Sequence, residues 1–398
     1  MSKLVTAPGS IVAPDELRAI AADGTKLRYA LMDLASKISD AIVLGRGDPD
    51  LDTPAHVISA VRLAILDGRA DVAAPISGLS ALREAVANKL RTQNLIPTEP
   101  DDVLITDGGQ EALYLLMQTL LNPEDEILVP DPRYSSYDEA IHHAGARMVL
   151  VPTYPEDNFD LRSTEIEKRI TPKTKAILVI SPSNPTAAVV GPASVRAVAE
   201  IACRHNLVVI SDEIYEKLIY SPSVQTSIAS LPGMYERTIT LGGFSKTYAM
   251  TGWRVGYVAA PADFIEMLVA VKASTTGAIS TVSQYAALAA LTGSQDIVAE
   301  YHEIYSRRRS LILGGLGEMG FTYGNPQGAF FVYTNAVSSG IPAFELSYLL
   351  LKEAHVLIFP GTAFGEKWVD WLRIAYLQPE DQLALALDRM KGVLGRHR

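Results

Sequence analysis

The sequence has little cysteine, no long apolar run and no excess of positive charge. Its one cysteine, Cys203, excludes an internal disulfide and fits a reducing compartment. No apolar run approaches the length of a membrane span, and the first residues lack an apolar signal core, so we expect a cytoplasmic protein without a membrane partner. The net charge of −10 argues against a nucleic-acid partner, since phosphate binding requires clustered lysine and arginine.

The spacing that metal ligands need is also missing. The seven histidines are scattered, and the adjacent His142 and His143 would point in different directions on a helix, so we expect no metal site. Cys203 follows a helical apolar pattern over residues 195–202. That pattern favours packing of Cys203 in the core over a reactive thiol.

The length of 398 residues allows two domains, each with its own core. Between residues 103 and 259, short apolar runs alternate with amphipathic helical patterns. This alternation predicts an α/β fold with a mostly parallel sheet sandwiched by helices. After about residue 290 a long charged helix and mixed elements predict a smaller α+β domain. We expect residues 1–45 to form an N-terminal arm and part of the small domain, 46–290 the large domain, and 291–398 the rest of the small domain.

Polar residues follow the predicted strands at their carboxyl ends, where ligands of such sheets bind. These residues are Gly108 and Gly109, Tyr134, the loop 181–184, Ser211 to Glu213, and Lys246.

Gly108 and Gly109 precede a predicted helix that starts at Gln110. Free backbone N–H groups and the positive end of the helix dipole make such a turn a phosphate site. Asp107, three residues before Gln110, resembles the first residue of a capping box.

Lys246 lies at a predicted strand end among glycine and serine residues. Partial desolvation there would lower the pKa of the amine and free its lone pair to attack a carbonyl. Taken alone, such a lysine is more often a surface residue. Asp212, after another strand, suits a general base, a metal ligand, a partner for a heteroaromatic nitrogen, or a helix cap. Asn184 lies in a proline-stiffened loop, where an Asx turn is as common as a functional role.

These motifs together resemble the fold-type I aminotransferases of class I and II, which use pyridoxal 5′-phosphate (PLP). The resemblance extends from Gly45 to Ala375. It is carried by Gly47-Asp48-Pro49, Gly78 with Leu82-Arg83, Gly108-Gly109, Ser183-Asn184-Pro185-Thr186, Asp212-Glu213-Ile214-Tyr215, Ser245-Lys246, Thr251-Gly252-Trp253-Arg254-Val255-Gly256 and Arg373.

The resemblance implies catalytic roles for Lys246, Asp212 and Tyr215. Lys246 would be the lysine that forms a Schiff base with PLP, and Asp212 would pair with the pyridinium nitrogen. Tyr215 and Asn184 would hydrogen-bond the phenolic oxygen of the ring, and Tyr134 would stack on its face.

The resemblance also implies where the charged ends of cofactor and substrate bind. Gly108, Gly109 and Gln110 would hold the phosphate through backbone N–H groups, with Arg254 as the cationic partner. Arg373 would bind the α-carboxylate of the substrate, with Gly47 and Asn184 nearby.

The implied activity is transfer of an amino group from an L-amino acid to a 2-oxo acid by a ping-pong mechanism. The implied assembly is a homodimer with active sites at the subunit interface.

Four features depart from the family pattern or bear on specificity. At two positions many relatives have hydroxyl groups that contact the phosphate, whereas this chain has Gly243 at one and Ala73 or Ala74 at the other. We therefore expect weaker PLP retention than in those relatives. Ala187 replaces a customary glycine. Gln110 stands where some aspartate-active relatives have lysine, which favours a neutral or aromatic donor over aspartate.

The same residues are compatible with other functions. A PLP-dependent lyase, a decarboxylase or a cyclopropane-forming synthase uses the same scaffold. A PLP-binding regulator would need an added DNA-binding domain, and this acidic chain has no room for one before residue 45. A nicotinamide dehydrogenase is disfavoured because Gly45 and Gly47 lack a third glycine at dinucleotide spacing.

Overall fold

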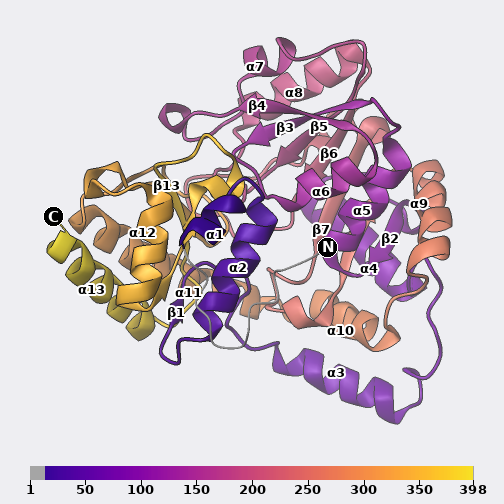
Figure 1. Cartoon of the computed structure of the whole chain (residues 1–398). Coiled ribbons are helices and arrows are strands. Elements are labelled where there is room, and N and C mark those ends of the chain that lie inside the picture. The colour runs from indigo at the N-terminus through magenta and orange to yellow at the C-terminus, as the bar shows by residue number, and fades with distance from the viewer. Residues whose placement is uncertain (1–13, 398) are drawn as a thin grey trace.

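The computed structural model describes residues 14–397, and a seven-stranded sheet forms the centre of its larger part (Figure 1). The strand order is β2-β8-β7-β6-β5-β3-β4, and β8 runs antiparallel to the other six strands, which are parallel to one another. This arrangement confirms the α/β class with a mostly parallel sheet. The strands are β2 (Val103–Thr106), β3 (Glu126–Asp131), β4 (Arg147–Pro152), β5 (Thr174–Ile180), β6 (Val208–Asp212), β7 (Thr238–Gly243) and β8 (Gly256–Ala259).

Helices cover both faces of this sheet because the strands bury side chains on both sides. Along β5, for example, Leu178 packs in the cluster that includes α5 and α6, while Ile177 and Val179 pack against α8. The helices of this part are α3 (Ala55–Leu66), α4 (Ser80–Lys89), α5 (Gly108–Leu120), α6 (Ser136–His143), α7 (Ser163–Glu167), α8 (Pro192–His205), α9 (Ala262–Thr275) and α10 (Thr281–Thr292).

The smaller part contains a four-stranded antiparallel sheet, in the order β12-β13-β10-β9, and a short parallel pair, β1 with β11. The β1–β11 pair joins Ile42 to Val356, so the first described segment lies against the C-terminal third of the chain. The strands are β1 (Ile42–Val43), β9 (Thr322–Tyr323), β10 (Phe331–Asn335), β11 (Val356–Leu357), β12 (Phe359–Pro360) and β13 (Trp371–Ala375). The helices are α1 (Pro14–Ala19), α2 (Gly24–Ser36), α11 (Asp296–Glu318), α12 (Ala343–Leu349) and α13 (Glu380–His397).

Strand register aligns the ends of three neighbouring parallel strands. Asp212 on β6 pairs with Ile180 on β5 and with Leu241 on β7. The loops that follow these strands therefore leave the sheet at one level, on the side that faces the smaller part.

One expectation about the core was wrong. Cys203 is exposed, and its Sγ lies 3.8 Å from Sδ of Met234. The buried face of α8 includes Val198, Ala199 and Ala202, so Cys203 falls one position past that face in the last turn. Within residues 14–397, no helix is long and apolar enough to cross a membrane. No group of three potential metal ligands occurs in that range either.

Candidate active site

The structure brings the sequence-predicted residues together around one cavity of about 580 Å³ at the carboxyl ends of the parallel strands. The cavity is lined by Gly47, Gly109, Gln110, Tyr134, Asn184, Asp212, Tyr215, Lys246, Arg254 and Arg373, among others. Gly108 lies beside the cavity, against the guanidinium group of Arg254. A Cβ at position 108 would come within 2.5 Å of Nη2 of that arginine.

Lys246 enters the cavity from the loop after β7. Its Nζ donates a hydrogen bond to the carbonyl oxygen of Gly47 (2.7 Å) and lies 3.5 Å from Oδ1 of Asp48. Burial lowers the pKa of Lys246, and the negative charge of Asp48 opposes that shift. The amine is therefore closer to its neutral, nucleophilic form than an exposed lysine would be.

Asp212 ends β6, and two donors hold its carboxylate. The hydroxyl of Tyr137 donates to Oδ2 (2.5 Å), and the backbone N–H of Ile214 donates to Oδ1 (3.1 Å). Burial raises the pKa of Asp212, while the two hydrogen bonds favour the ionised form. This fixed carboxylate can pair with a cationic heteroaromatic nitrogen.

Arg373 on β13 is 2% exposed, and its partners are neutral oxygens. Nη1 donates to Oδ1 of Asn184 (2.9 Å), and Nη2 donates to the carbonyl oxygen of Gly45. Its Nε is buried and has no hydrogen-bond partner among the described residues. Burial and the charge of Arg28 lower the pKa of Arg373. A guanidinium group held in this way at a cavity wall is suited to bind a carboxylate.

The N-terminus of α5 borders the same cavity. A Cβ added at Gly109 would meet no atom within 4 Å, so the backbone there borders open space. Nη2 of Arg254 donates to the carbonyl oxygen of Asp107 (3.3 Å), and Nε lies 3.5 Å from Oδ1 of Asp107. Free N–H groups at a helix start beside a guanidinium group are suited to hold a phosphate.

Asp107 is the N-cap residue of α5, but the capping box expected from its spacing to Gln110 is not formed. Its side chain makes no capping hydrogen bond. Instead, its backbone N–H donates to Oε2 of Glu111 (2.6 Å). The carboxylate of Asp107 lies beside Arg254 instead. Arg254 is too far away in the sequence for a local capping pattern to predict this contact.

Three further residues line the cavity for which no sequence motif predicted a role: Arg28, Tyr137 and Asp48. Tyr137 lies one helical turn after Tyr134, and that spacing is a signal that could have identified it. Asp48 belongs to a recognised motif but was given no function. No local pattern marks Arg28, because α2 reaches the cavity only through tertiary packing.

The structure shows what surrounds the positions that depart from the family pattern. A Cβ at Gly243 would come within 2.8 Å of Cδ1 of Ile214, so a larger residue requires that side chain to move. Ala187 has φ = 58°, a left-handed conformation that explains why glycine is customary there. Ala73 is exposed, whereas Ala74 is buried and donates its N–H to Oγ1 of Thr281 (3.1 Å).

Known proteins resemble this chain over almost its whole length. The sequence model of the family "Aminotransferase class I and II" matches residues 39–390. An aspartate aminotransferase of Pyrococcus abyssi is 42% identical over 367 residues, which cover 92% of this chain and 94% of that protein. An aromatic-amino-acid aminotransferase of Thermococcus litoralis is 41% identical with the same coverage.

A solved structure agrees with these sequence matches. The crystal structure of an aromatic aminotransferase from Pyrococcus horikoshii has a TM-score of 0.87 and 41% identity. It covers 92% of this chain, and the match includes 99% of that chain. Similarity of this extent in sequence and fold shows that the chain belongs to the class I and II aminotransferase family.

Proposed function

We propose that this aminotransferase uses PLP to move an amino group from an L-amino acid to a 2-oxo acid by a ping-pong mechanism. One observation carries the proposal. Lys246, whose pKa is lowered by burial, shares a single cavity with Asp212, Arg254 and Arg373. A neutral amine is the form that attacks a carbonyl, and the other three side chains match the charged ends of a cofactor and an amino acid.

The residues around the cavity fit PLP. The open backbone at Gly109 and the guanidinium group of Arg254 would hold the phosphate. Asp212 would pair with the ring nitrogen, Tyr134 would lie against the ring, and Lys246 would attach the cofactor covalently. When bound, PLP supplies an electron sink for the electron pair released at the substrate Cα.

Proton transfer during the reaction would depend on Lys246 and Asp48. We expect Nζ of Lys246, freed when the substrate amine takes its place on the cofactor, to take the proton from the substrate Cα as general base. As general acid it would then deliver that proton to the cofactor carbon. The lowered pKa suits the first step. Asp48, 3.5 Å from Nζ, would stabilise the amine once it is protonated.

Arg373 would orient the substrate. Among residues 14–397 its guanidinium group donates hydrogen bonds to neutral oxygens of Asn184 and Gly45, so an incoming α-carboxylate would supply the missing negative charge. Tyr215, beside the same cavity, would hydrogen-bond the phenolic oxygen of the cofactor ring.

The surroundings of the cavity support a neutral or aromatic donor and an acidic acceptor. Gln110 is uncharged, and Tyr29, Met32 and Leu113 add apolar surface. Arg28 lines the same cavity, and among the described residues its guanidinium group donates to Oγ of Ser135 (2.7 Å) and to the carbonyl oxygen of Gly24 (3.2 Å), both of which are neutral. We propose that Arg28 binds the distal carboxylate of a dicarboxylic 2-oxo acid in the second half-reaction.

We further propose that the enzyme works as a cytoplasmic homodimer. Residues 46–290 would form the PLP-binding domain, and residues 1–45 with 291–398 the small domain. The pairing of β1 with β11 supports this division for the described residues. Residues 1–13 lie outside the described part of the chain.

A panel of amino acids tests the proposal. The holoenzyme should convert a donor to its 2-oxo acid while the bound cofactor changes to its amine form. A lyase or decarboxylase would instead release a cleavage product or carbon dioxide and leave the cofactor unchanged.

Lys246→Ala tests the role of the lysine. Borohydride should fix PLP to the wild-type protein but not to this variant, and the variant should turn over negligibly. Lys173→Ala, a change of an exposed lysine, is the matched control and should behave as wild type. Near-normal turnover by Lys246→Ala would refute the assignment.

A further inference from the structure

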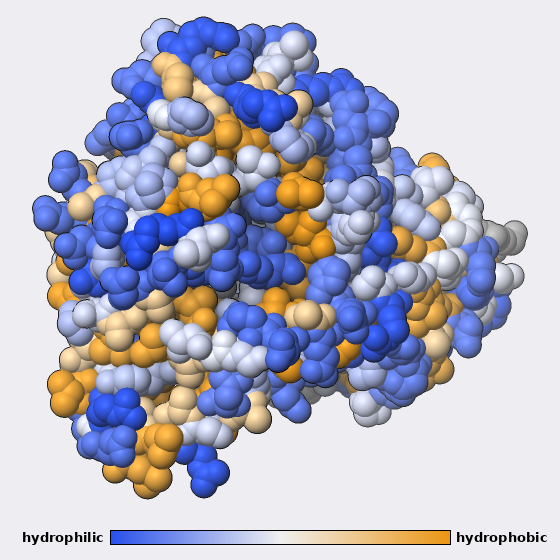
Figure 2. Space-filling model, turned by 180° about the vertical axis from the view of Figure 1, so that it is seen from behind, coloured by the Kyte–Doolittle hydropathy of each residue, from blue (hydrophilic) through white to orange (hydrophobic). Residues whose placement is uncertain are grey.

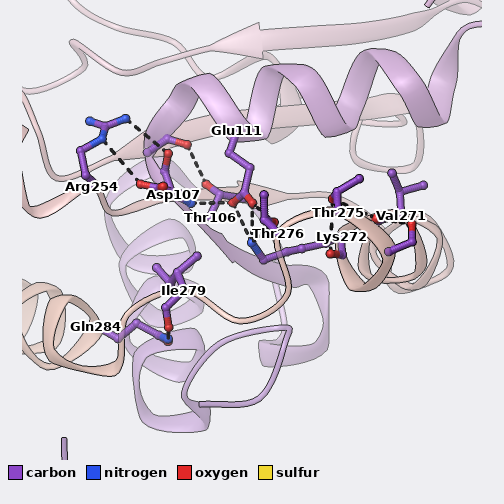
Figure 3. A network of polar contacts seen from close by, with 12 residues as sticks. Thr106, Asp107, Glu111, Arg254, Val271, Lys272, Thr275, Thr276, Ile279 and Gln284 are labelled. Carbon is purple, nitrogen blue, oxygen red and sulfur yellow. Dashed lines mark hydrogen bonds and ion pairs between the residues drawn. The ribbon is translucent and has the colours of Figure 1, made fainter. Parts of the chain in front are cut away.

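A buried ion pair lies directly behind the N-terminus of α5. Nζ of Lys272, on α9, donates to both carboxylate oxygens of Glu111 at 2.7 Å. The side chain of Lys272 is 0% exposed and that of Glu111 is 8% exposed. Figure 3 shows the two side chains meeting beside the first turn of α5, with Arg254 beyond the start of that helix. None of the roles proposed above uses this pair.

Glu111 connects the pair to the proposed phosphate site. Besides Lys272, its carboxylate accepts hydrogen bonds from the hydroxyl of Thr276 and from the backbone N–H of Asp107 (2.6 Å). Asp107 in turn holds Arg254 through its carbonyl oxygen and its carboxylate. A continuous set of contacts therefore runs from Lys272 to the guanidinium group that faces the cavity (Figure 3).

Stability alone does not account for this arrangement. Removing two charges from water costs about as much as their attraction returns, and apolar residues of the same shape often stabilise a fold equally well. The position of the pair offers a better reason. Glu111 is two residues after Gly109, in the first turn of the helix whose N-terminus borders the cavity.

The sign of the charge at this position matters for an anionic ligand. An uncompensated carboxylate in the first turn would repel a phosphate bound at the same helix end. Lys272 neutralises that carboxylate without removing its hydrogen bonds. Glu111 can then fix Asp107 and Arg254 while the field at the helix end stays favourable to an anion.

We propose that Lys272 is a positioning residue for the cofactor phosphate. It neutralises Glu111 and, through Glu111 and Asp107, holds Arg254 in place at the N-terminus of α5. This inference rests on the proposed use of PLP. It assigns to Lys272 and Glu111 an effect on the phosphate group and none on the ring.

The test compares PLP with pyridoxal, which lacks the phosphate. Dissociation constants of both are measured by absorbance titration of the full-length protein freed of cofactor. Lys272→Met should weaken PLP binding about tenfold, because it leaves the charge of Glu111 uncompensated. Its effect on pyridoxal should be about twofold or less. The double variant Lys272→Met with Glu111→Gln, which removes both charges, should recover most of the lost PLP affinity.

Two further variants keep the result interpretable. Glu111→Gln alone keeps the positive charge of Lys272. The preference for PLP over pyridoxal should therefore be at least as large in this variant as in wild type. Lys89→Met is the matched control, because Lys89 is a buried lysine paired with Glu216 away from the phosphate site. This control should lower thermal stability and leave the ratio of the two dissociation constants unchanged.

Specific outcomes overturn the inference. Equal losses for PLP and pyridoxal in Lys272→Met would show a general structural role. A double variant that binds PLP as weakly as Lys272→Met would exclude charge compensation. If Lys272→Met fails to fold, Glu111→Gln provides the test. A smaller preference for PLP over pyridoxal in Glu111→Gln than in wild type would then contradict the inference. A wild-type protein that binds neither compound would refute the proposed function itself.

Discussion

Single side chains from distant parts of the sequence set the chemistry of the cavity. The combination of motifs along the chain, and the family resemblance that it carries, predicted roles for Lys246, Asp212 and Arg373, none of which is distinctive alone. The motifs did not identify Tyr137 or Arg28, whose importance depends on where α6 and α2 pack. The partner of a charged group is a property of the folded chain, and a linear pattern does not contain it.

Tyr137 should tune the protonation of Asp212. Tyr137→Phe removes a donor that favours the ionised carboxylate, so the pKa of Asp212 should rise further above its ordinary value. If the ionised form pairs with the cofactor, the acidic limb of the kcat/KM profile moves to higher pH. Turnover at neutral pH should fall about tenfold or more. The measurement is the pH dependence of kcat/KM.

Tyr220→Phe is the matched control for Tyr137→Phe. Its hydroxyl is also buried, but it donates to the carbonyl oxygen of Ala329 (2.8 Å) away from the cavity. This variant should keep the wild-type pH profile. An unshifted acidic limb in Tyr137→Phe would contradict the role given to its hydroxyl.

Arg28 should discriminate acidic from neutral 2-oxo acids. Arg28→Gln removes the cation that we assign to the distal carboxylate, so kcat/KM for a dicarboxylic 2-oxo acid should fall about 10- to 100-fold. The value for an aromatic monocarboxylic acceptor should change about threefold or less. Arg204→Gln, an exposed arginine on α8, should change neither value. Equal losses for both acceptors would argue against a distal carboxylate subsite.

At the scale of elements, hydrophobic periodicity predicted the strands of the large sheet and most helices around it. It gave no prediction for α9 or α10, because both contain apolar residues on more than one side and lack a clear polar face. It also left the strand register undetermined. That register, which sets Asp212 level with Leu241, depends on packing between strands far apart in sequence.

The turn after β6 contains a second buried acid, Glu213, with an unusual titration. Burial and the nearby charge of Glu216 raise the pKa of Glu213 to about 7. The hydroxyl groups of Ser211 and Ser227 donate to its carboxylate at 2.9 and 2.6 Å. Because the native state binds this proton more tightly than the unfolded chain, the stability from Glu213 is present at low pH. It is lost as the pH rises through about 7.

Glu213→Gln should therefore become relatively more stable as the pH rises. The amide stays neutral and can still accept the hydroxyl hydrogen bonds, so the melting temperature of the variant minus that of wild type should increase from about pH 5 to about pH 8. Over this range Glu216→Gln should show no such increase, because a carboxyl whose pKa is lowered is ionised in both the folded and the unfolded state above about pH 5. Burial opposes ionisation of Glu216, but Lys89 lowers its pKa, so its contribution is present at high pH. A pH-independent difference for Glu213→Gln would contradict the raised pKa.

At the scale of the whole molecule, α3 presents apolar side chains on two sides. One side, which includes Val57 and Ala64, is buried with α10. The other side exposes Leu63 (56%) and Leu66 (80%). Figure 1 shows α3 along the lower edge of the molecule, and Figure 2, from behind, shows apolar residues among polar ones along that edge. Exposed apolar residues grouped on one helix often mark a contact with another protein.

This arrangement gives a direct test of the proposed homodimer. Leu63→Glu with Leu66→Glu should convert a dimer to a monomer in sedimentation experiments, because burying two carboxylates at an interface is unfavourable. The fold should survive, since neither side chain belongs to the buried side of α3. Val224→Glu with Val337→Glu changes residues of similar exposure (66% and 64%) elsewhere and should leave the dimer intact. A monomeric wild-type protein, or a variant that stays dimeric, would exclude α3 as the contact. Because the family resemblance places active sites at a subunit interface, the monomeric variant should also lose activity.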